Sequence, residues 1–231
     1  MATSAHKSRL LLGDFSLSSK VNQVSNAWAA EQLDVTTLAD AEKNFIPGVD
    51  SSTFSMSGFY DLATHSDLTA WTGENPLTFF PHGDAVSSQC LIQSALRATF
   101  EPGVSVMGVV SFDLGAQTTG PTDLGVGLHA LGAETATANG TIVDNAASTA
   151  NGAVGSLHVT AFTGFTQIVV DVRHSTDNFG VNDNSLISFT TVTGVTSEIK
   201  AATGTVQRYV RVIWTATGTG SCTFGVGFAR R

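Results

Sequence analysis

The sequence has little charge. Only 13% of its 231 residues are Asp, Glu, Lys or Arg, whereas an average soluble domain has roughly 25%. A protein that remains a free monomer usually carries more charge on its surface than this. The shortage therefore favours a surface that neighbouring subunits cover. A secreted β-sandwich, which can also be rich in Thr, Ser and Gly, is the other interpretation that this composition leaves open.

Cysteines and long apolar runs are also scarce. Cys90 and Cys222 are the two cysteines, too few for a disulfide framework. Both stand in apolar, strand-like settings, so we expect buried thiols. The run Leu10–Leu12 is far too short for a signal peptide or for a membrane span of about 20 residues. The sequence therefore predicts a protein made and used in soluble form, without a secretion signal and without a membrane partner.

The sequence lacks the common catalytic motifs: it has no G-x-S-x-G elbow, no P-loop and no H-E-x-x-H. Its six histidines are scattered, and only His174 has a partner at metal-ligand spacing, Asp177. That pair lies where a strand is expected to run into a turn. Gly125-Val126-Gly127 with Gly132 misses the dinucleotide-binding spacing. We therefore predict no enzyme activity, no catalytic or metal-binding residues and no cofactor.

The net charge of −8 is concentrated in one part of the chain. From Glu31 to Asp144 there are 14 acidic residues against Lys43 and Arg97, a net of −12 (2 − 14). An acidic body argues against gripping nucleic acid, because that affinity depends on neutralising phosphates. It is compatible with a surface past which DNA slides without sticking. Ordinary solubility is the simpler explanation that charge alone also allows.

Threonine and glycine are abundant: 30 threonines equal the number of charged residues, and 23 glycines add to them. Threonine favours strands and glycine favours turns. Apolar residues alternate with polar ones over 92–100, 104–114, 167–173 and 222–228, which is typical of strands with one buried face. Glu101-Pro102-Gly103 has the composition of a turn between the first two of these. The sequence therefore predicts an all-β fold that contains this hairpin.

Other segments depart from the alternating pattern. Val206–Trp214 is apolar on both faces, which predicts a strand that is covered on both sides and buries Trp214. Asp61–Trp71 predicts one short helix with Asp61 as its N-cap. Ala27–Leu33 has helical propensity but runs into β-favouring residues, so local propensity leaves it undecided. Asn139–Gly152 is small and polar, and we expect any internal domain boundary to lie there.

Two segments carry a family resemblance. Residues 33–61, LDVTTLADAEKNFIPGVDSSTFSMSGFYD, resemble the N-terminal signature of the major tail proteins of siphophages, particularly those of actinobacteria. Within it, the resemblance implies strands at Val35–Thr37 and at Thr53–Gly58. Residues 204–231, GTVQRYVRVIWTATGTGSCTFGVGFARR, are similar to the C-terminal end of phage tail proteins. The two segments together make up 57 (29 + 28) of the 231 residues.

The resemblance implies a tail tube protein: a β-sandwich or barrel with one short helix and long loops. Its copies would form homo-hexameric rings that stack into a hollow tube for DNA ejection. The implied partners are the tape measure protein, tail terminator and baseplate proteins, and genomic DNA that passes through the lumen without sequence-specific binding. The implied location is the virion tail, after synthesis in the cytoplasm of the host bacterium.

The polar segment from Ala39 to Ser52 is too long for a tight hairpin turn, and long loops are usually functional or disordered. We predict that it is a loop that reaches the adjacent ring, with Phe45, Ile46, Pro47 and Gly48 as the contact residues. A mobile surface loop is the alternative.

Two questions of organisation stay open at this point. Residues 1–231 can form one tail-tube-like domain, or residues 153–231 can form a separate β-sandwich that decorates the tube. The final strands are apolar on both faces, which favours the single domain. The alternative functions are a capsid decoration or baseplate protein, or a carbohydrate-binding sandwich for host attachment. The last predicts an exposed aromatic platform from Trp71, Trp214 or Phe165.

Overall fold

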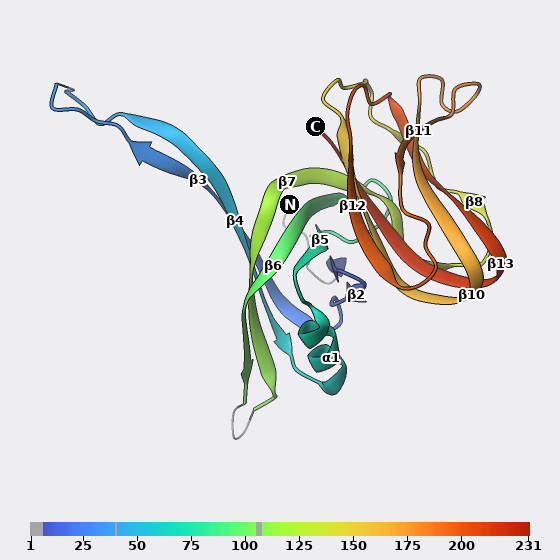
Figure 1. Cartoon of the computed structure of the whole chain (residues 1–231), viewed down its shortest axis with the longest axis horizontal. Helices are drawn as coiled ribbons and strands as arrows, with labels where there is room; N and C mark the ends of the chain where they lie inside the picture. The colour runs from blue at the N-terminus through green and yellow to red at the C-terminus, as the bar shows by residue number, and fades with distance from the viewer. Residues whose placement is uncertain (1–6, 40, 105–107) are drawn as a thin grey trace.

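The computed structural model describes residues 7–39, 41–104 and 108–231 and confirms the all-β fold class (Figure 1). A single helix in this part of the chain, α1, spans Leu62–Ala70. The strands are β1 Arg9–Leu12, β2 Phe15–Ser16, β3 Val21–Asp34, β4 Phe45–Phe59, β5 Glu74–Phe80, β6 Gln89–Gly103, β7 Ser111–Glu134, β8 Ala138–Asn139, β9 Val143–Asp144, β10 Ala153–Ser175, β11 Asn184–Ser188, β12 Thr196–Ala202 and β13 Tyr209–Arg230. None of the helical residues described forms a segment long and apolar enough to cross a membrane.

The strands form one continuous antiparallel sheet in the order β11-β10-β13-β7-β6-β5-β1-β2. Strand β4 joins β7, β3 joins β4, and β12 joins β10. Strand β7 is 24 residues long and belongs to both parts of the molecule. Its residues 111–117 pair with β4, and its residues 126–134 pair with β13 (Figure 1). The sheet bends along β7, so the N-terminal and C-terminal halves of the chain share this strand.

The C-terminal half has the core that the alternation predicts. Ile168, Val170 and Val172 on β10 are fully buried, as are the alternating apolar residues of 222–228 on β13. Trp214 is also buried, as predicted. Strands β8 and β9, which fall at the start and in the middle of the expected linker 139–152, pair with β13. The linker residues therefore lie along the sheet, while the division of the chain into domains stays a prediction.

The helix α1 covers the core of the N-terminal half. Asp61 is its N-cap, as predicted, and its carboxylate accepts a hydrogen bond of 2.6 Å from the Thr64 backbone N–H. Leu68 on the helix and Trp71 just after it are buried in one cluster with Phe54 of β4 and with apolar residues of β7. One face of β4 and β7 is therefore apolar and covered, and the opposite face is free to be polar.

The hairpin predicted for residues 92–114 is present as β6 and β7, but its turn was misplaced. Glu101-Pro102-Gly103 is the end of β6, paired with residues 111–113 of β7. The expected strand at 104–114 begins only at Ser111, and residues 105–107 of that prediction lie outside the described residues. Pro102 is tolerated in a strand here because this part of β6 is a sheet edge. The sequence signal for a turn therefore marked an edge strand.

The segment Ala27–Leu33, undecided between helix and strand, is part of β3. The strand predicted at Thr53–Gly58 is confirmed within β4. The strand implied for Val35–Thr37 is wrong, because β3 ends at Asp34. The Asp34 carboxylate accepts a hydrogen bond of 2.9 Å from the Thr36 backbone N–H, a turn motif that competes with the ladder.

Candidate assembly surface

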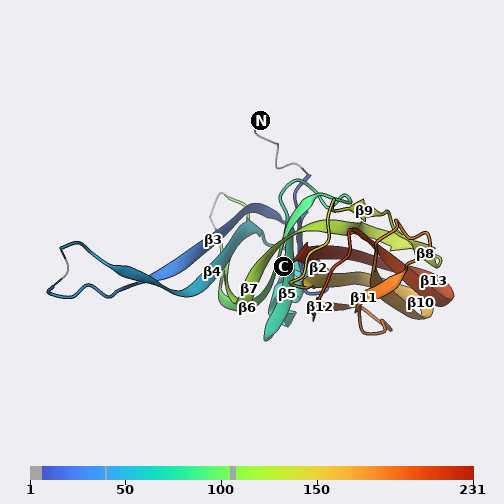
Figure 2. The same ribbon diagram turned by 90° about the horizontal axis from the view of Figure 1, so that it is seen from above.

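The most prominent feature of the molecule is a two-stranded arm formed by β3 and β4 (Figures 1 and 2). The two strands pair along their whole length, from Val21 opposite Gly58 to Asp34 opposite Phe45. Strand β4 pairs with β7 only over 53–59. The rest of the hairpin therefore extends from the body with no third strand beside it. Two-stranded hairpins are marginally stable alone in water, so this arm lacks part of the packing that a stable sheet needs.

Large apolar side chains of the arm are exposed to solvent. Trp28 is 55% exposed, and the other exposed ones are Leu33, Val35, Leu38, Phe45 and Ile46. Single exposed apolar residues are normal on protein surfaces, but a concentration of them marks an interaction site. The arm is therefore the best candidate for a contact surface with another chain.

The four predicted contact residues lie near the distal end of the arm, but in a strand rather than in a loop. Phe45 pairs with Asp34, Ile46 with Leu33 and Pro47 with Gln32, all within β4. Gly48 follows them in the strand, close to Glu31. The predicted loop 39–52 is therefore wrong from residue 45 onward.

The connection between the arm strands is the shorter segment 35–44, in which residue 40 lies outside the described residues. The hydroxyl of Thr36 accepts a hydrogen bond of 2.9 Å from the Asn44 backbone N–H, and the Val35 N–H donates to the Asn44 carbonyl at 2.9 Å. These bonds close the end of the hairpin. Sequence reasoning missed the strand because the partner residues are 11 to 24 positions away (45 − 34 to 52 − 28) and the segment shows no regular alternation of apolar and polar residues.

The sheet that carries the arm has two free edges. Its local order is β3-β4-β7-β6, and β4 is the single described strand that pairs with β3. At the other side, β6 pairs with β5 only up to Leu96, so residues 97–103 pair with β7 alone. Free edges present unpaired N–H and C=O groups that readily accept another strand. Each copy therefore offers one edge on either side of this four-stranded segment.

The uncovered face of this segment is polar and hollowed. Hydroxyl side chains from β4 and β6 and carboxylates from β6 and β7 surround a depression of about 270 Å³. Glu101 of β6 stands directly opposite Asp113 of β7, and both are exposed. No basic residue is among those that line the depression. Opposed like charges destabilise a sheet, so this pair does not stabilise the fold. Sequence reasoning did not single it out.

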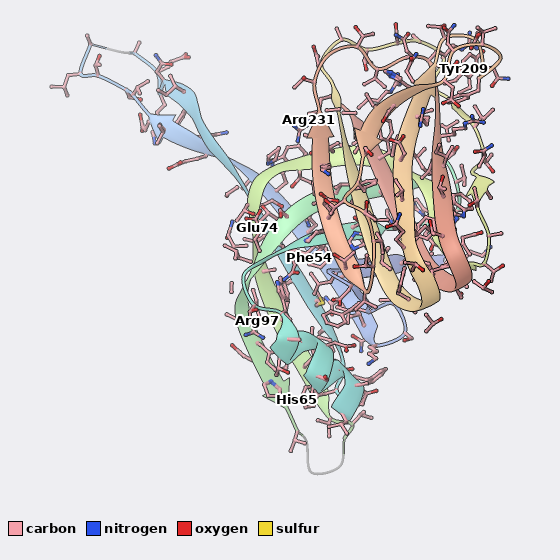
Figure 3. The ribbon with its side chains drawn as sticks, turned by 45° about the vertical axis from the view of Figure 1, so that its right-hand side comes forward. Phe54, His65, Glu74, Arg97, Tyr209 and Arg231 are labelled. Atoms are coloured by element: carbon pink, nitrogen blue, oxygen red, sulfur yellow. The ribbon has the colours of Figure 1, made fainter. Side chains whose placement is uncertain are left out.

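The opposite face of the same sheet is covered by α1. Arg97, one of the two bases in the acidic part of the chain, reaches across to α1 and donates to the Leu68 carbonyl at 2.5 Å (Figure 3). Phe54 packs on this side with the helix cluster (Figure 3). Arg97 and the carboxylates of the depression therefore lie on different faces of the sheet.

The structure brings together no catalytic arrangement from the residues considered in the sequence. Within the described ranges, no three His, Cys, Asp or Glu residues could hold a metal ion together. His174 accepts a hydrogen bond from the Gln207 backbone N–H, while Asp177 organises the following turn. Hydrogen bonds from Ser175 and from the Val181 backbone lower the pKa of Asp177 to about 2. Both residues therefore have structural partners.

Both cysteines are buried free thiols, as expected. Burial raises the pKa of the Cys90 thiol to about 12 and that of Cys222 to about 11. A thiol with so high a pKa is a poor nucleophile at neutral pH.

The aromatic platform that a sugar-binding module would need is not formed by the predicted residues. Trp71, Trp214 and Phe165 are all buried. The Trp214 indole donates a hydrogen bond of 2.9 Å to the Ala136 carbonyl, and its ring packs edge-on against His129. These three rings belong to the core and cannot stack on a sugar at the surface.

No protein-family model matches the chain, and no curated protein does. Among solved structures, a chain of the native gene transfer agent (GTA) virion is 17% identical with a TM-score of 0.40, over 53% of this chain and 98% of its own. A chain of the tail of an empty GTA particle, which has C6 symmetry, is 15% identical with a TM-score of 0.38, over 53% and 97%. The SPP1 Dit protein, described as a paradigm of the hub adsorption apparatus in Gram-positive infecting phages, is 12% identical with a TM-score of 0.39, over 96% and 98%. Because similarities at these TM-scores do not establish a common fold, the residues of the chain itself have to carry the functional conclusion.

Proposed function

We propose that this chain is a structural protein of a virion tail, and more specifically the major tail tube subunit. Its copies would assemble into hexameric rings, which stack into the hollow channel for DNA ejection. The observation that carries the proposal is the four-stranded segment β3-β4-β7-β6, which has a free edge on each side and an apolar arm extending from it.

The strand directions suit a ring. Each strand of the segment is antiparallel to its neighbours, so β3 and β6 run in opposite directions. If β6 of one copy lies beside β3 of the next, the antiparallel alternation continues from copy to copy. Such a contact joins two different surfaces, and repeated contacts of this kind close into a ring when the rotation between copies allows it. A closed ring would leave no free edge, so the strands could no longer pair with unrelated chains.

The polar face of the segment is suited to line the channel. Glu101 and Asp113 would repel the phosphates of DNA. The hydroxyl-bearing side chains beside them carry no positive charge that would bind those phosphates. The cost of opposing two carboxylates in one sheet would then be explained by function. The opposite, apolar face is already covered by α1 and is not available to the lumen.

The remaining parts of the proposal follow from the resemblance in the sequence. The protein would be made in the cytoplasm of the host bacterium and would reside in the virion tail. It would meet the tape measure, tail terminator and baseplate proteins. The C-terminal strands β10–β13 would form the outer part of the subunit, either as part of one domain or as a decorating sandwich.

A baseplate ring protein is the second candidate. It is favoured by the extent of the C-terminal half, where β10 and β13 alone span 23 and 22 residues outside the four-stranded segment. A baseplate protein would use the same lateral contact but would end as a single ring, because its two ring faces meet different partners.

Electron microscopy of the purified full chain at increasing concentration tests these functions. Tubes with a central channel are the expected result. Single rings that never stack would favour the baseplate protein. A monomer at high concentration that binds glycans would contradict both.

A further inference from the structure

A groove on the body, away from the arm, lies where β6, β7 and β13 meet. Its volume is about 690 Å³, and Pro81, Leu91, Leu124 and Val126 supply much of its apolar lining. Leu124 is 64% exposed although it lies within a long strand. An apolar groove of this size that leaves a leucine in water is typical of a docking surface.

One arginine at the mouth of the groove has no acidic partner among the described residues. Arg230 and Arg231, at the end of the chain, both line it (Figure 3 labels Arg231). Arg231 forms a two-pronged ion pair with Asp123 at 2.9 Å, so its charge is matched. Arg230 donates instead to the backbone carbonyls of Ala147 and Asn145. Carbonyl groups satisfy its hydrogen bonds but leave its positive charge unmatched.

The distal part of the arm has the complementary character. We call residues 31–39 and 41–46 the arm tip. Its exposed apolar residues are Leu33, Val35, Leu38, Phe45 and Ile46.

The charges of the arm tip are mainly negative. Glu31, Asp34 and Glu42 outnumber Lys43, and all four are exposed. No ion pair found among the described residues includes any of them. The arm tip is therefore apolar with unmatched acids, and the groove is apolar with an unmatched base.

Both views of the molecule show the arm extending away from the body that bears the groove (Figures 1 and 2). We propose that the groove receives the arm tip of a second copy of this chain, with the apolar side chains covering Leu124 and the acids lying near Arg230. This inference rests on the proposed function and names the surface on which the arm docks.

A cross-linking experiment tests the pairing directly. Full-length I46C and L124C chains are mixed under assembling conditions, oxidised and separated without reducing agent. Disulfide-linked heterodimers are expected, because Ile46 of one copy would lie over Leu124 of another. Because Cys90 also lines the groove, both chains carry C90S. The native Cys222 is buried with a raised pKa and should not compete. The control mixes I46C with L62C, since Leu62 on α1 is 85% exposed but does not line the groove.

Charge reversal gives a second, independent test. R230E should raise the concentration needed for assembly by about tenfold or more, and adding E31K and E42K in the same chain should restore it. Circular dichroism of each variant confirms that the subunit is folded.

The outcomes separate the two proposals. Rings or tubes that form normally without the I46C–L124C cross-link, and that tolerate R230E, would overturn the groove proposal and leave the proposed function standing. A chain that never assembles would overturn both.

Discussion

His158 is fully buried, and its ring joins three separate parts of the chain. Its Nδ1 donates to the Gly13 carbonyl at 2.7 Å, so in the neutral ring Nε2 accepts from the Thr78 hydroxyl at 2.8 Å. Thr78 in turn contacts the Ser156 hydroxyl at 2.8 Å. This buried network links the β1–β2 turn and β5 to β10. A neutral ring fits the network, and burial lowers the pKa of His158 to about 4.

We expect His158 to make the fold acid-sensitive at a defined pH. An ordinary histidine has a pKa near 6.5, so unfolding at lower pH takes up a proton on His158. The stability due to the neutral ring is therefore complete above pH 6.5 and is lost as the pH falls toward 4. The loss should reach roughly 3 kcal/mol at pH 4, from about 1.4 kcal/mol for each unit of pKa.

The measurement is the free energy of unfolding by urea between pH 7 and pH 4. H158Q should be less stable at pH 7 but should lose less stability than the wild type over this range. H82Q, at an exposed position, is the matched control and should follow the wild type. Parallel curves for the wild type and H158Q would contradict the assignment. Asp144 and Asp177, whose pKa values are lowered to about 2, act below this window.

The opposed carboxylates Glu101 and Asp113 give a second prediction about single residues. Either E101Q or D113N removes the repulsion across the strand pair and should stabilise the subunit by about 0.5 kcal/mol at low salt. The gain should shrink in high salt, because these charges are exposed and screened. Urea unfolding at two salt concentrations measures it. Glu42 lies in the connection 35–44, outside the strand pairs, so E42Q should show no gain. An equal gain there would remove the pairwise explanation.

At this scale the sequence predicted burial better than exposure. Cys90 and Cys222 were expected inside because both stand in apolar, strand-like settings, and Trp214 because its strand is apolar on both faces. All three are buried. The exposure of Trp28 was not expected, and neither was the pairing of Glu101 with Asp113. Both depend on which strand lies opposite, and that is decided by long-range pairing rather than by local pattern.

At the scale of the elements, the exposed arm leads to a prediction that tryptophan fluorescence can test. The chain has three tryptophans, and in the subunit Trp71 and Trp214 are buried while Trp28 is exposed. If assembly covers the arm, Trp28 should move into an apolar environment and shift the emission to shorter wavelength. The shift should appear with assembly and be absent in W28F. A W28F sample that assembles and still shows the full shift would place the contact elsewhere.

The elements also show where local signals fail. The short helix was predictable because its N-cap, Asp61, and its buried Leu68 and Trp71 are local features. The turn expected at Glu101–Gly103 is strand instead, since pairing with β7 outweighs local turn propensity at a sheet edge. The same cause made residues 45–52 look like a loop. The arm could not be found from sequence, because its strands are regular only in each other's presence.

In the molecule as a whole, the two halves are joined by a close backbone contact as well as by His158. A Cβ atom at Gly125 on β7 would lie 2.2 Å from the Phe228 carbonyl oxygen on β13. Only glycine lets the two strands approach this closely at the bend of the sheet. The C-terminal half is therefore fixed on the N-terminal half, and the free edges of the four-stranded segment are held in a constant relation to the outer strands. A subunit with such fixed geometry can repeat the same lateral contact around a ring.

That repeated contact should make thermal stability depend on protein concentration. Assembly that binds only folded subunits stabilises them by mass action, by about 1.4 kcal/mol for each tenfold excess over the dissociation constant. The Tm of the wild-type chain should therefore rise steadily as the protein concentration is increased about a hundredfold. The variant F45S/I46S changes two exposed residues of the arm tip, so it should keep the same Tm in dilute solution and gain less on concentration. Differential scanning calorimetry measures the Tm of the wild type and of the variant. A wild-type Tm that does not change with concentration would show that assembly does not stabilise the subunit.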